Sequence, residues 1–191
     1  FINEVIIPSL DLAFDNEKNF AASIRDPLTG LYNHGYFKFQ LEREFDNAKR
    51  GKSNLSLIML DVDYFKHYND MHGHPAGDKV LIGISNILKY NTRKGDLAAR
   101  YGGEEFVILL FNTKIKEAIA KAEAMRRAIV HYHFQNEELQ PNGDLTISLG
   151  IANFPKQAKT ADELLENADK ALYHSKKTGK NKTSVYSKSM K

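Results

Sequence analysis

RYGGEEFVILLF, residues 100–111, places the pairs Gly102-Gly103 and Glu104-Glu105 directly before six apolar residues. Glycine adopts positive φ angles at little cost, so a glycine pair suits the tight turn of a β-hairpin. The apolar run that follows is typical of a buried strand. We therefore predict two strands within this region, joined at the glycines, with the glutamates held at the mouth of the second strand.

NLSLIMLDVD, residues 54–63, predicts another buried strand that ends in acid. We expect the strand itself over 54–60, followed by Asp61 and Asp63. If this strand is a neighbour of the hairpin, Asp61 and Glu104 converge at one edge of the sheet. We expect Asp61 and Asp63 to point to opposite faces, so that only Asp61 shares a site with the glutamates.

Carboxylates brought together repel each other unless a cation neutralises them. A hard divalent ion with oxygen ligands is the natural partner, and Mg²⁺ often uses one or two carboxylates plus substrate phosphates. Taken alone, each acidic motif is more simply explained as solvated side chains at the end of a strand. The two motifs together favour a metal site.

The remaining pattern predicts an α+β domain. Residues 1–25 predict a helix outside the core, and the turn-rich RDPLTGLYN places the start of the main domain, 26–191, directly after it. The order βααββαβ favours helices packed around a central antiparallel sheet. Helices are expected at 33–50, 64–72, 76–90, 114–134 and 161–178, and further strands at 144–154 and 183–186.

Several polar groups near the acidic strand end suit a nucleotide. The helix start after Asp63 offers free backbone N–H groups to an anion, and Lys66 adds a positive charge there. In NDMHGHPAGDKV, residues 69–80, the Asp78 carboxylate could accept from both the N1–H and the exocyclic amine of guanine. Adenine offers no such pair. Alone, Lys66 is a surface lysine and Asp78 caps a helix.

Composition excludes several classes of protein. With 191 residues and a net charge of only +3, the chain has no basic stripe for tracking a nucleic-acid polymer. The absence of cysteine excludes disulfides, and no window approaches the roughly 20 apolar residues that span a bilayer. We expect a cytoplasmic domain, whether or not the parent is membrane-anchored. Because residue 1 is Phe, we also expect a piece of a longer chain.

Six motifs, taken in order and spacing, resemble the GGDEF-domain diguanylate cyclases over about 26–186: DPLTGLYN, LDVDYFKHYND, GHPAGD, RYGGEEF, SLGIA and ADKALYHSKKTGKN. The resemblance implies a palm-like fold of the nucleotidyl cyclase and ferredoxin-like type. It implies condensation of two GTP molecules into cyclic di-GMP with release of two pyrophosphates. It further implies a homodimer, since each domain holds one GTP, and an upstream sensor domain in the parent chain.

The resemblance also implies roles for individual residues. The metal ligands are Asp61, the Val62 carbonyl and Glu104, and the ion is Mg²⁺, with Mn²⁺ as the alternative. Glu104 matches the residue that helps to deprotonate the attacking 3′-hydroxyl, and Glu105 and Lys66 complete the catalytic set. The substrate-binding positions are Tyr64, Phe65, Lys66, Asn69, His74, Asp78, Lys176 and Lys180, of which Asn69 and Asp78 read guanine.

One position departs from the family pattern. The family usually has arginine where this chain has Lys180, so a bidentate phosphate contact becomes a single point charge. We expect weaker triphosphate binding from this change, without loss of activity.

NTRKGDLAARYGGEEF contains an R-x-x-D motif, Arg93 and Asp96, five residues before the glycine pair. Such a motif is usually a loop ion pair worth about 0–1 kcal/mol. At this offset it matches the family's product-inhibition site, where Arg93 would grip guanine or phosphate and Asp96 would accept from guanine. Further arginines usually complete that site, and Arg126 and Arg127 are candidates.

Three alternatives remain beside an active diguanylate cyclase. A catalytically silent module could bind cyclic di-GMP through Arg93 and Asp96 alone, although the retained Asp61, Glu104 and Asp78 argue against it. A cyclase for mixed guanine–adenine dinucleotides typically differs at Asp78. A purely structural dimerisation module would not explain why so many polar groups converge.

Overall fold

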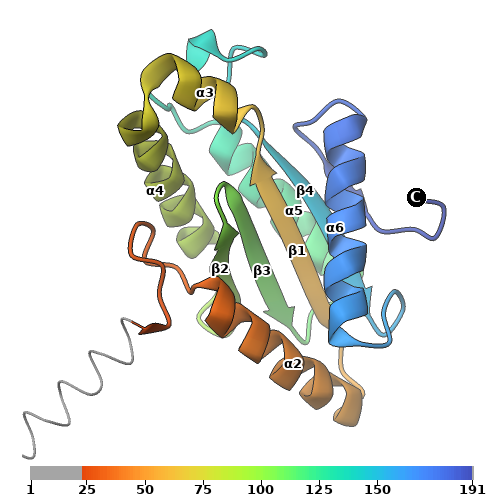
Figure 1. Ribbon diagram of the computed structural model, residues 1–191. Coiled ribbons are helices and arrows are strands. Elements are labelled where there is room, and N and C mark those ends of the chain that lie inside the picture. Colours follow the sequence, from red (N-terminus) through yellow and green to blue (C-terminus); the bar gives the residue numbers. More distant parts are fainter. Residues whose placement is uncertain (1–22, 191) are drawn as a thin grey trace, which may run out of the picture.

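A five-stranded sheet forms the centre of the computed structural model, which describes residues 23–190 (Figure 1). The strand order is β2-β3-β1-β4-β5, with β1 paired to β3 and to β4. All neighbouring pairs are antiparallel except β4 and β5, which are parallel. The strands are β1 (Leu55–Val62), β2 (Leu97–Gly102), β3 (Glu105–Phe111), β4 (Ile147–Phe154) and β5 (Thr183–Val185).

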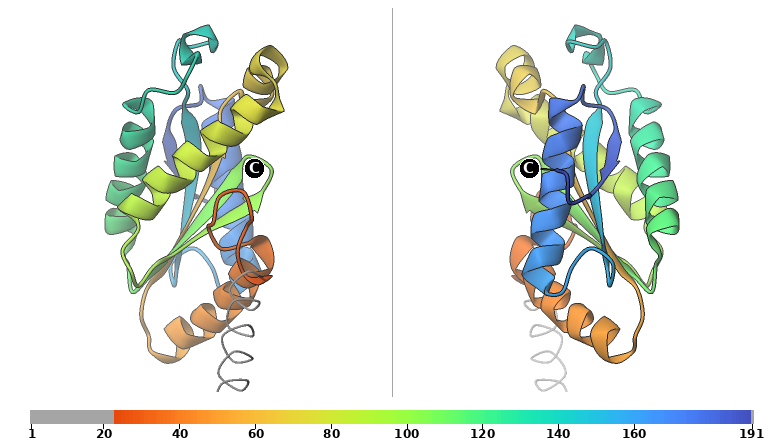
Figure 2. Two further views of the ribbon diagram at one scale, coloured as in Figure 1. Left: turned by 90° about the vertical axis from the view of Figure 1, so that its left-hand side faces the viewer. Right: turned by 90° about the vertical axis from the view of Figure 1, so that its right-hand side faces the viewer.

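Helices cover both faces of the sheet, as the two side views in Figure 2 show. Helices α2 and α6 pack on one face, and α4 and α5 pack on the other. The short helices α3 and η1 lie beyond one end of the sheet (Figure 1). The helices are α2 (His34–Arg50), α3 (Phe65–His72), α4 (His74–Asn91), α5 (Ile115–Val130), η1 (Glu137–Leu139) and α6 (Ala161–Lys177).

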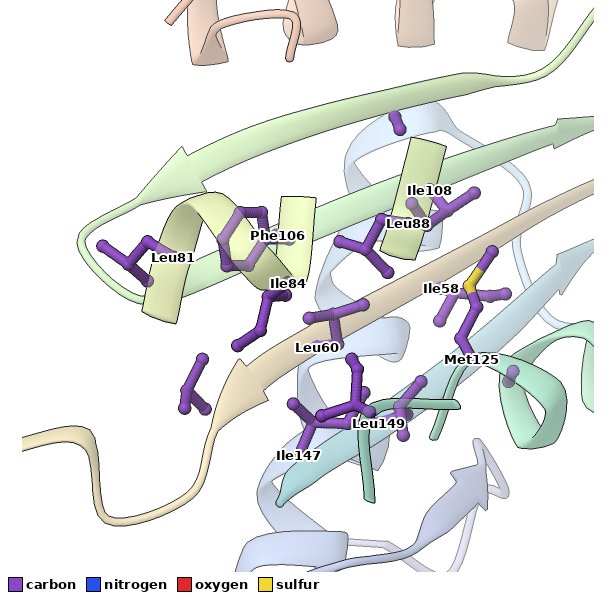
Figure 3. Packing of buried hydrophobic residues seen from close by; sticks show 14 of the residues in the cluster. Ile58, Leu60, Leu81, Ile84, Leu88, Phe106, Ile108, Met125, Ile147 and Leu149 are labelled. Carbon is purple, nitrogen blue, oxygen red and sulfur yellow. The ribbon is translucent and has the colours of Figure 1, made fainter. Parts of the chain in front are cut away.

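The continuous apolar run of β1 is explained by its burial on both faces. Leu57 and Met59 pack toward α2 and α6, whereas Ile58 and Leu60 belong to the cluster under α4 and α5. Figure 3 shows Ile58 and Leu60 in that second cluster, with Met125 of α5 close by. Because successive side chains of a strand point to opposite faces, both positions must be apolar when both faces are covered.

The predicted α+β architecture is confirmed, and several details differ, among them the start of β4 at Ile147 instead of residue 144. The sheet is mixed, because the chain crosses over through α6 after β4 and brings β5 back in parallel. Helix α5 ends at Val130, short of the expected 134, and a turn with the 3₁₀ helix η1 follows. The helix expected over 1–25 falls mainly on residues 1–22, which lie outside the described residues. Across 23–190, no helix has the length and apolar character needed to cross a bilayer.

Candidate active site

Acidic side chains from β1 and from the hairpin meet at one end of the sheet. Asp61 is the register partner of Glu105 in the antiparallel pair of β1 and β3. The backbone N–H of Val62 donates to the Glu104 carbonyl at 3.3 Å. Glu104 itself occupies the turn, and β3 begins one residue later than expected, at Glu105. The convergence of these acids predicted from the sequence is therefore present.

Asp61 lies at the centre of this acidic group, and its side chain is only 5% exposed. Burial raises the pKa of Asp61 to about 6, against the opposing effect of Lys176, whose Nζ lies 2.6 Å from Oδ2. The charges of Glu104 and Glu105 raise this pKa further. A carboxylate held in this way loses hydration and faces like charges, so a cation beside it is favoured.

Glu105 experiences the same kind of environment. Burial raises the pKa of Glu105, Lys176 lowers it, and the charges of Asp169 and Glu104 raise it again. Asp169, on α6, was not anticipated from the sequence. It lies 64 positions away in the chain, and only the packing of α6 brings it close.

The donors in this group fit a hard divalent ion. Asp61 and Glu104 carry carboxylate oxygens, and Val62, whose carbonyl is expected as a third ligand, is joined to Glu104 through its backbone N–H. Within residues 23–190, no group of three or more acidic, histidine or cysteine side chains forms a metal site. The fit therefore rests on two carboxylates and a backbone oxygen, a set that Mg²⁺ completes with water and phosphate.

The expectation that Asp61 and Asp63 lie on opposite faces was wrong. Side chains two residues apart share a face of an extended strand, and Ser148, the register partner of Asp61, donates to Asp63 Oδ1 at 2.7 Å. Asp63 Oδ2 accepts from the Thr146 hydroxyl at 2.7 Å and from the Asn181 backbone N–H at 3.0 Å. Asp63 is thus buried and fully engaged in structural hydrogen bonds, which leaves Asp61 for the site.

The start of α3 and the end of α6 frame the space beside the acids. Tyr64 precedes α3 in the left-handed region, at φ 57°, and Lys66 is exposed in the first turn. The side chain of Phe65 is buried in the core, so only its backbone can face a ligand. Lys180 lies over the Tyr64 ring, with Nζ 4.9 Å from the centroid. Together these groups offer helix N–H donors and cations to an anion.

The residues expected to read guanine lie on the consecutive helices α3 and α4. Asn69 Oδ1 is buried without a hydrogen-bond partner among the described residues. A Cβ added to Gly77 would lie 1.8 Å from that oxygen, so glycine is required for Asn69 to occupy this position. His74 is the first residue of α4 and Asp78 lies one turn further along the helix, and both side chains are exposed. The orphaned buried oxygen of α3 and the exposed carboxylate of α4 are groups that a polar base could bind.

The R-x-x-D motif forms a compact cluster at the other end of the β-hairpin. Arg93 Nε lies 2.9 Å from Asp96 Oδ2, and Arg93 also donates to Thr113 Oγ1 at 3.0 Å. The Asp96 side chain has no exposed surface, whereas that of Arg93 is 52% exposed. Asp96 accepts from the Phe111 backbone N–H, so it orients Arg93, and Arg93 is the residue open to a ligand.

The basic side chain beside Arg93 and Asp96 is neither Arg126 nor Arg127, the two candidates from the sequence. Lys121 of α5 lies 3.5 Å from Asp96 Oδ2, although no local pattern marks it. Arg126 is engaged elsewhere: it pairs with Glu123 and donates to Asn181 Oδ1 at 2.7 Å. Arg127 is exposed on the same helix. Lys121 is thus the basic side chain of α5 that contacts Asp96 in the described structure, and the role of Arg127 stays a prediction.

A sequence model of the family described as diguanylate cyclase, GGDEF domain, matches residues 23–182. The chain belongs to the GGDEF domain family. Diguanylate cyclase A of Treponema denticola is 37% identical over 177 residues, which cover 91% of this chain and 47% of that protein. Diguanylate cyclase DgcP of Pseudomonas aeruginosa is 39% identical over 165 residues, 85% of this chain and 24% of the relative.

Solved structures also resemble this GGDEF domain. The GGDEF domain of DgcB from Caulobacter crescentus, crystallised in complex with c-di-GMP, superposes with a TM-score of 0.79 at 31% identity. That match covers 85% of this chain and 93% of the other. The chain spans less than half of the length of the two curated relatives, which therefore carry further segments. Nucleotidyl cyclases of this family generally use divalent metal ions.

Replacing Asp61 with Asn is predicted to stabilise the metal-free domain at neutral pH. The pKa of Asp61 is about 6 in the folded chain and about 3.8 when unfolded, so the folded state binds more protons between these values. The free energy of unfolding of the wild type therefore falls as pH rises through this window. The advantage of Asp61→Asn, measured by urea denaturation with chelator, should be about 2 kcal/mol larger at pH 8 than at pH 4.5. An advantage independent of pH would contradict this.

Gly77→Ala is predicted to weaken guanine nucleotide binding without unfolding the domain. The new methyl group displaces Asn69 Oδ1, the end of a side chain that can rotate away, and alanine is the better helix former. We expect the Kd for GTP, measured by calorimetry, to rise about tenfold. Gly83→Ala is the matched control, because it lies on the same helix and contacts Phe134 instead of Asn69. Equal effects of the two substitutions would refute the prediction.

Proposed function

We propose that this GGDEF domain is a diguanylate cyclase that condenses two GTP molecules into cyclic di-GMP and releases two pyrophosphates. The observation that carries the proposal is the meeting of Asp61 with the hairpin glutamates beside Lys176. This acidic group lies next to the start of α3, where an anion can bind, and α3 and α4 carry the residues proposed to read guanine. The named relatives support the same activity.

In the proposed reaction, the 3′-hydroxyl oxygen of one GTP forms a bond to the α-phosphorus of the other, and the bond to pyrophosphate breaks. Glu104 takes the hydroxyl proton, and the negative charge of Glu105 supports the site electrostatically. A bound Mg²⁺, held by Asp61, Glu104 and the Val62 carbonyl, would neutralise charge on the phosphates. Phosphoryl transfer of this kind depends mainly on alignment and charge stabilisation.

The cations around the acids have separate proposed roles. Lys176 pairs with Asp61 in the structure, and its ammonium group can stabilise the negative charge that develops on the transferred phosphate. Lys66 and Lys180 flank the start of α3, where they would hold the outer phosphates with the helix N–H groups. Asn69 and Asp78 would read the guanine edge, which adenine does not match. Selectivity then comes from leaving the buried Asn69 oxygen and the Asp78 carboxylate unmatched when the wrong base binds.

Two copies of the domain are needed for turnover. One GTP occupies each domain, and the hydroxyl of either nucleotide must face the α-phosphate of the other. A two-fold axis between identical sites supplies both alignments with a single arrangement. We propose a homodimer as the active species for this reason.

A second ligand site at Arg93 is proposed to bind the product. The exposed guanidinium of Arg93 is fixed by Asp96 and Thr113, so it is prearranged for a guanine edge or a phosphate. Lys121 adds positive charge nearby. The GGDEF domain of DgcB was crystallised in complex with c-di-GMP, which supports this molecule as a ligand of the fold. If the acidic site proved inactive, Arg93 would instead support a receptor function.

The cyclase proposal is tested by incubating the protein with GTP and Mg²⁺ and separating the products by chromatography. We expect cyclic di-GMP from the wild type and at least a hundredfold less from Glu104→Gln, because one carboxylate of the metal and proton site is lost. Lys159→Gln, on the surface far from the acids in sequence, serves as a control and should retain activity. The absence of product from wild type at high protein concentration would leave only the receptor function.

Arg93→Ala is predicted to relieve feedback inhibition. Initial rates at low product should remain within about twofold of wild type, whereas the inhibition constant for added cyclic di-GMP should rise at least tenfold, since a guanidinium contact of this kind contributes about 1–3 kcal/mol. Lys121→Ala should give a smaller rise. Unchanged sensitivity of Arg93→Ala to cyclic di-GMP would reject the site.

A further inference from the structure

We propose that Asp63, Asn181 and Arg126 form a clamp that positions Lys180 for the triphosphate. None of these three residues was assigned a place in the catalytic site, and Arg126 comes from α5, on the opposite face of the sheet from α6. The inference rests on the proposed function for its ligand, a nucleoside triphosphate. The cation that the clamp holds in place is the Lys180 ammonium, which lies beside the start of α3.

The loop that carries Lys180 has an unfavourable backbone conformation. Gly179, Lys180 and Asn181 all have positive φ angles, at 121°, 59° and 44°. Side chains other than glycine rarely occupy this region, although asparagine tolerates it better than most. Two consecutive non-glycine residues in this conformation persist only when surrounding contacts hold them.

Asp63 holds the loop from the side of the sheet. Its Oδ2 accepts from the Asn181 backbone N–H at 3.0 Å, and that contact joins residues 118 positions apart. The hydroxyls of Thr146 and Ser148 fix the same carboxylate from β4 and the residue before it. Because Asp63 is only 2% exposed, the bond to Asn181 forms where water competes little. The loop is thereby joined to the end of β1, two residues from Asp61.

Arg126 holds the same residue through its side chain. Its NH1 donates to Asn181 Oδ1 at 2.7 Å, while NH2 lies 3.0 Å from Glu123 Oε2 and Nε donates to the same carboxylate. The Arg126 side chain is 19% exposed, so a planar guanidinium is locked between two acceptors. Asn181 is therefore gripped at its backbone by Asp63 and at its amide by Arg126.

Because Asn181 is held at two points, the backbone of the adjacent Lys180 is also held in position. The Lys180 backbone N–H donates to the Ser175 carbonyl at 3.0 Å, and its Nζ lies over the Tyr64 ring at the start of α3. A lysine ammonium ends a flexible stem, so its position depends on where the backbone directs it. Arg126 is a positioning residue in this account, because it reaches the ligand only through Lys180.

The test is a double-mutant cycle on binding of a GTP analogue with a methylene group between the α- and β-phosphorus atoms, which cannot release pyrophosphate. Calorimetry in Mg²⁺ gives the Kd for wild type, Arg126→Ala, Lys180→Ala and the double variant. We expect each single substitution to raise the Kd about three- to tenfold. The double variant should bind no more weakly than Lys180→Ala, since both changes remove the same contact.

Two controls separate positioning from general destabilisation. Arg43→Ala removes another arginine that pairs with a glutamate on its own helix, Glu44, and it should leave the Kd unchanged. Asn181→Gly keeps the left-handed backbone and the N–H to Asp63 but removes the acceptor for Arg126, so it should match Arg126→Ala even if that variant is less stable. Thermal unfolding confirms that each variant is folded at the temperature of the titration.

Several outcomes would overturn the proposal. The first is an unchanged Kd in both Arg126→Ala and Asn181→Gly. The second is a double variant whose Kd rises by the product of the increases caused by Arg126→Ala and Lys180→Ala alone. The third is failure of the wild type to bind the analogue. The cyclase proposal fails separately, if the wild type binds the analogue but does not convert GTP. In that case the cycle still decides whether Arg126 acts through Lys180.

Discussion

The arrangement of the site depends on the burial of β1 between two helical layers and two neighbouring strands. This strand pairs with β3 on one side and β4 on the other, and no residue from Leu55 to Val62 is exposed. A strand held in this way cannot shift to let its terminal acid escape into water. Asp61 therefore remains opposite Glu105, with a pKa raised to about 6, chiefly by burial. Packing supplies the free energy that keeps these like charges together, and a bound cation would relieve their repulsion.

The second constraint is the close contact between α6 and β4. A Cβ added to Gly150 would lie 2.0 Å from the Leu172 backbone nitrogen and 2.2 Å from the Ala168 carbonyl oxygen. Backbone atoms cannot move aside as a side chain can, so only glycine permits this approach. One helical turn beyond Leu172, Lys176 reaches Asp61. The loop after α6 then reaches Asp63 through Asn181. The position of Lys176 beside Asp61 and that of Lys180 over Tyr64 both depend on this contact.

The sequence was sufficient wherever the signal is local. Apolar periodicity predicted the helices to within a few residues. One buried run that ends in acid and another that begins with acid predicted that Asp61 and the hairpin glutamates would meet. Contacts between distant segments carry no such signal, as Lys121 beside Asp96 and Asp169 near Glu105 show. The parallel pairing of β5 likewise depends on the crossover through α6. The error over Asp63 was of another kind, because the two-residue period already places it on the same face as Asp61.

Position 180 carries a lysine, where the resemblance to the family led us to expect an arginine, and a lysine makes the surrounding loop more important. An arginine carries five N–H donors in a planar fork and can form two parallel hydrogen bonds to a phosphate, which correct small errors in its position. A lysine ammonium has no such directional match, so its contribution depends on the distance alone. Distance is set here by a backbone with three positive φ angles, which Asp63 and Arg126 hold from opposite sides. A cation with little geometric selectivity of its own thus depends on the rigidity of the loop that presents it.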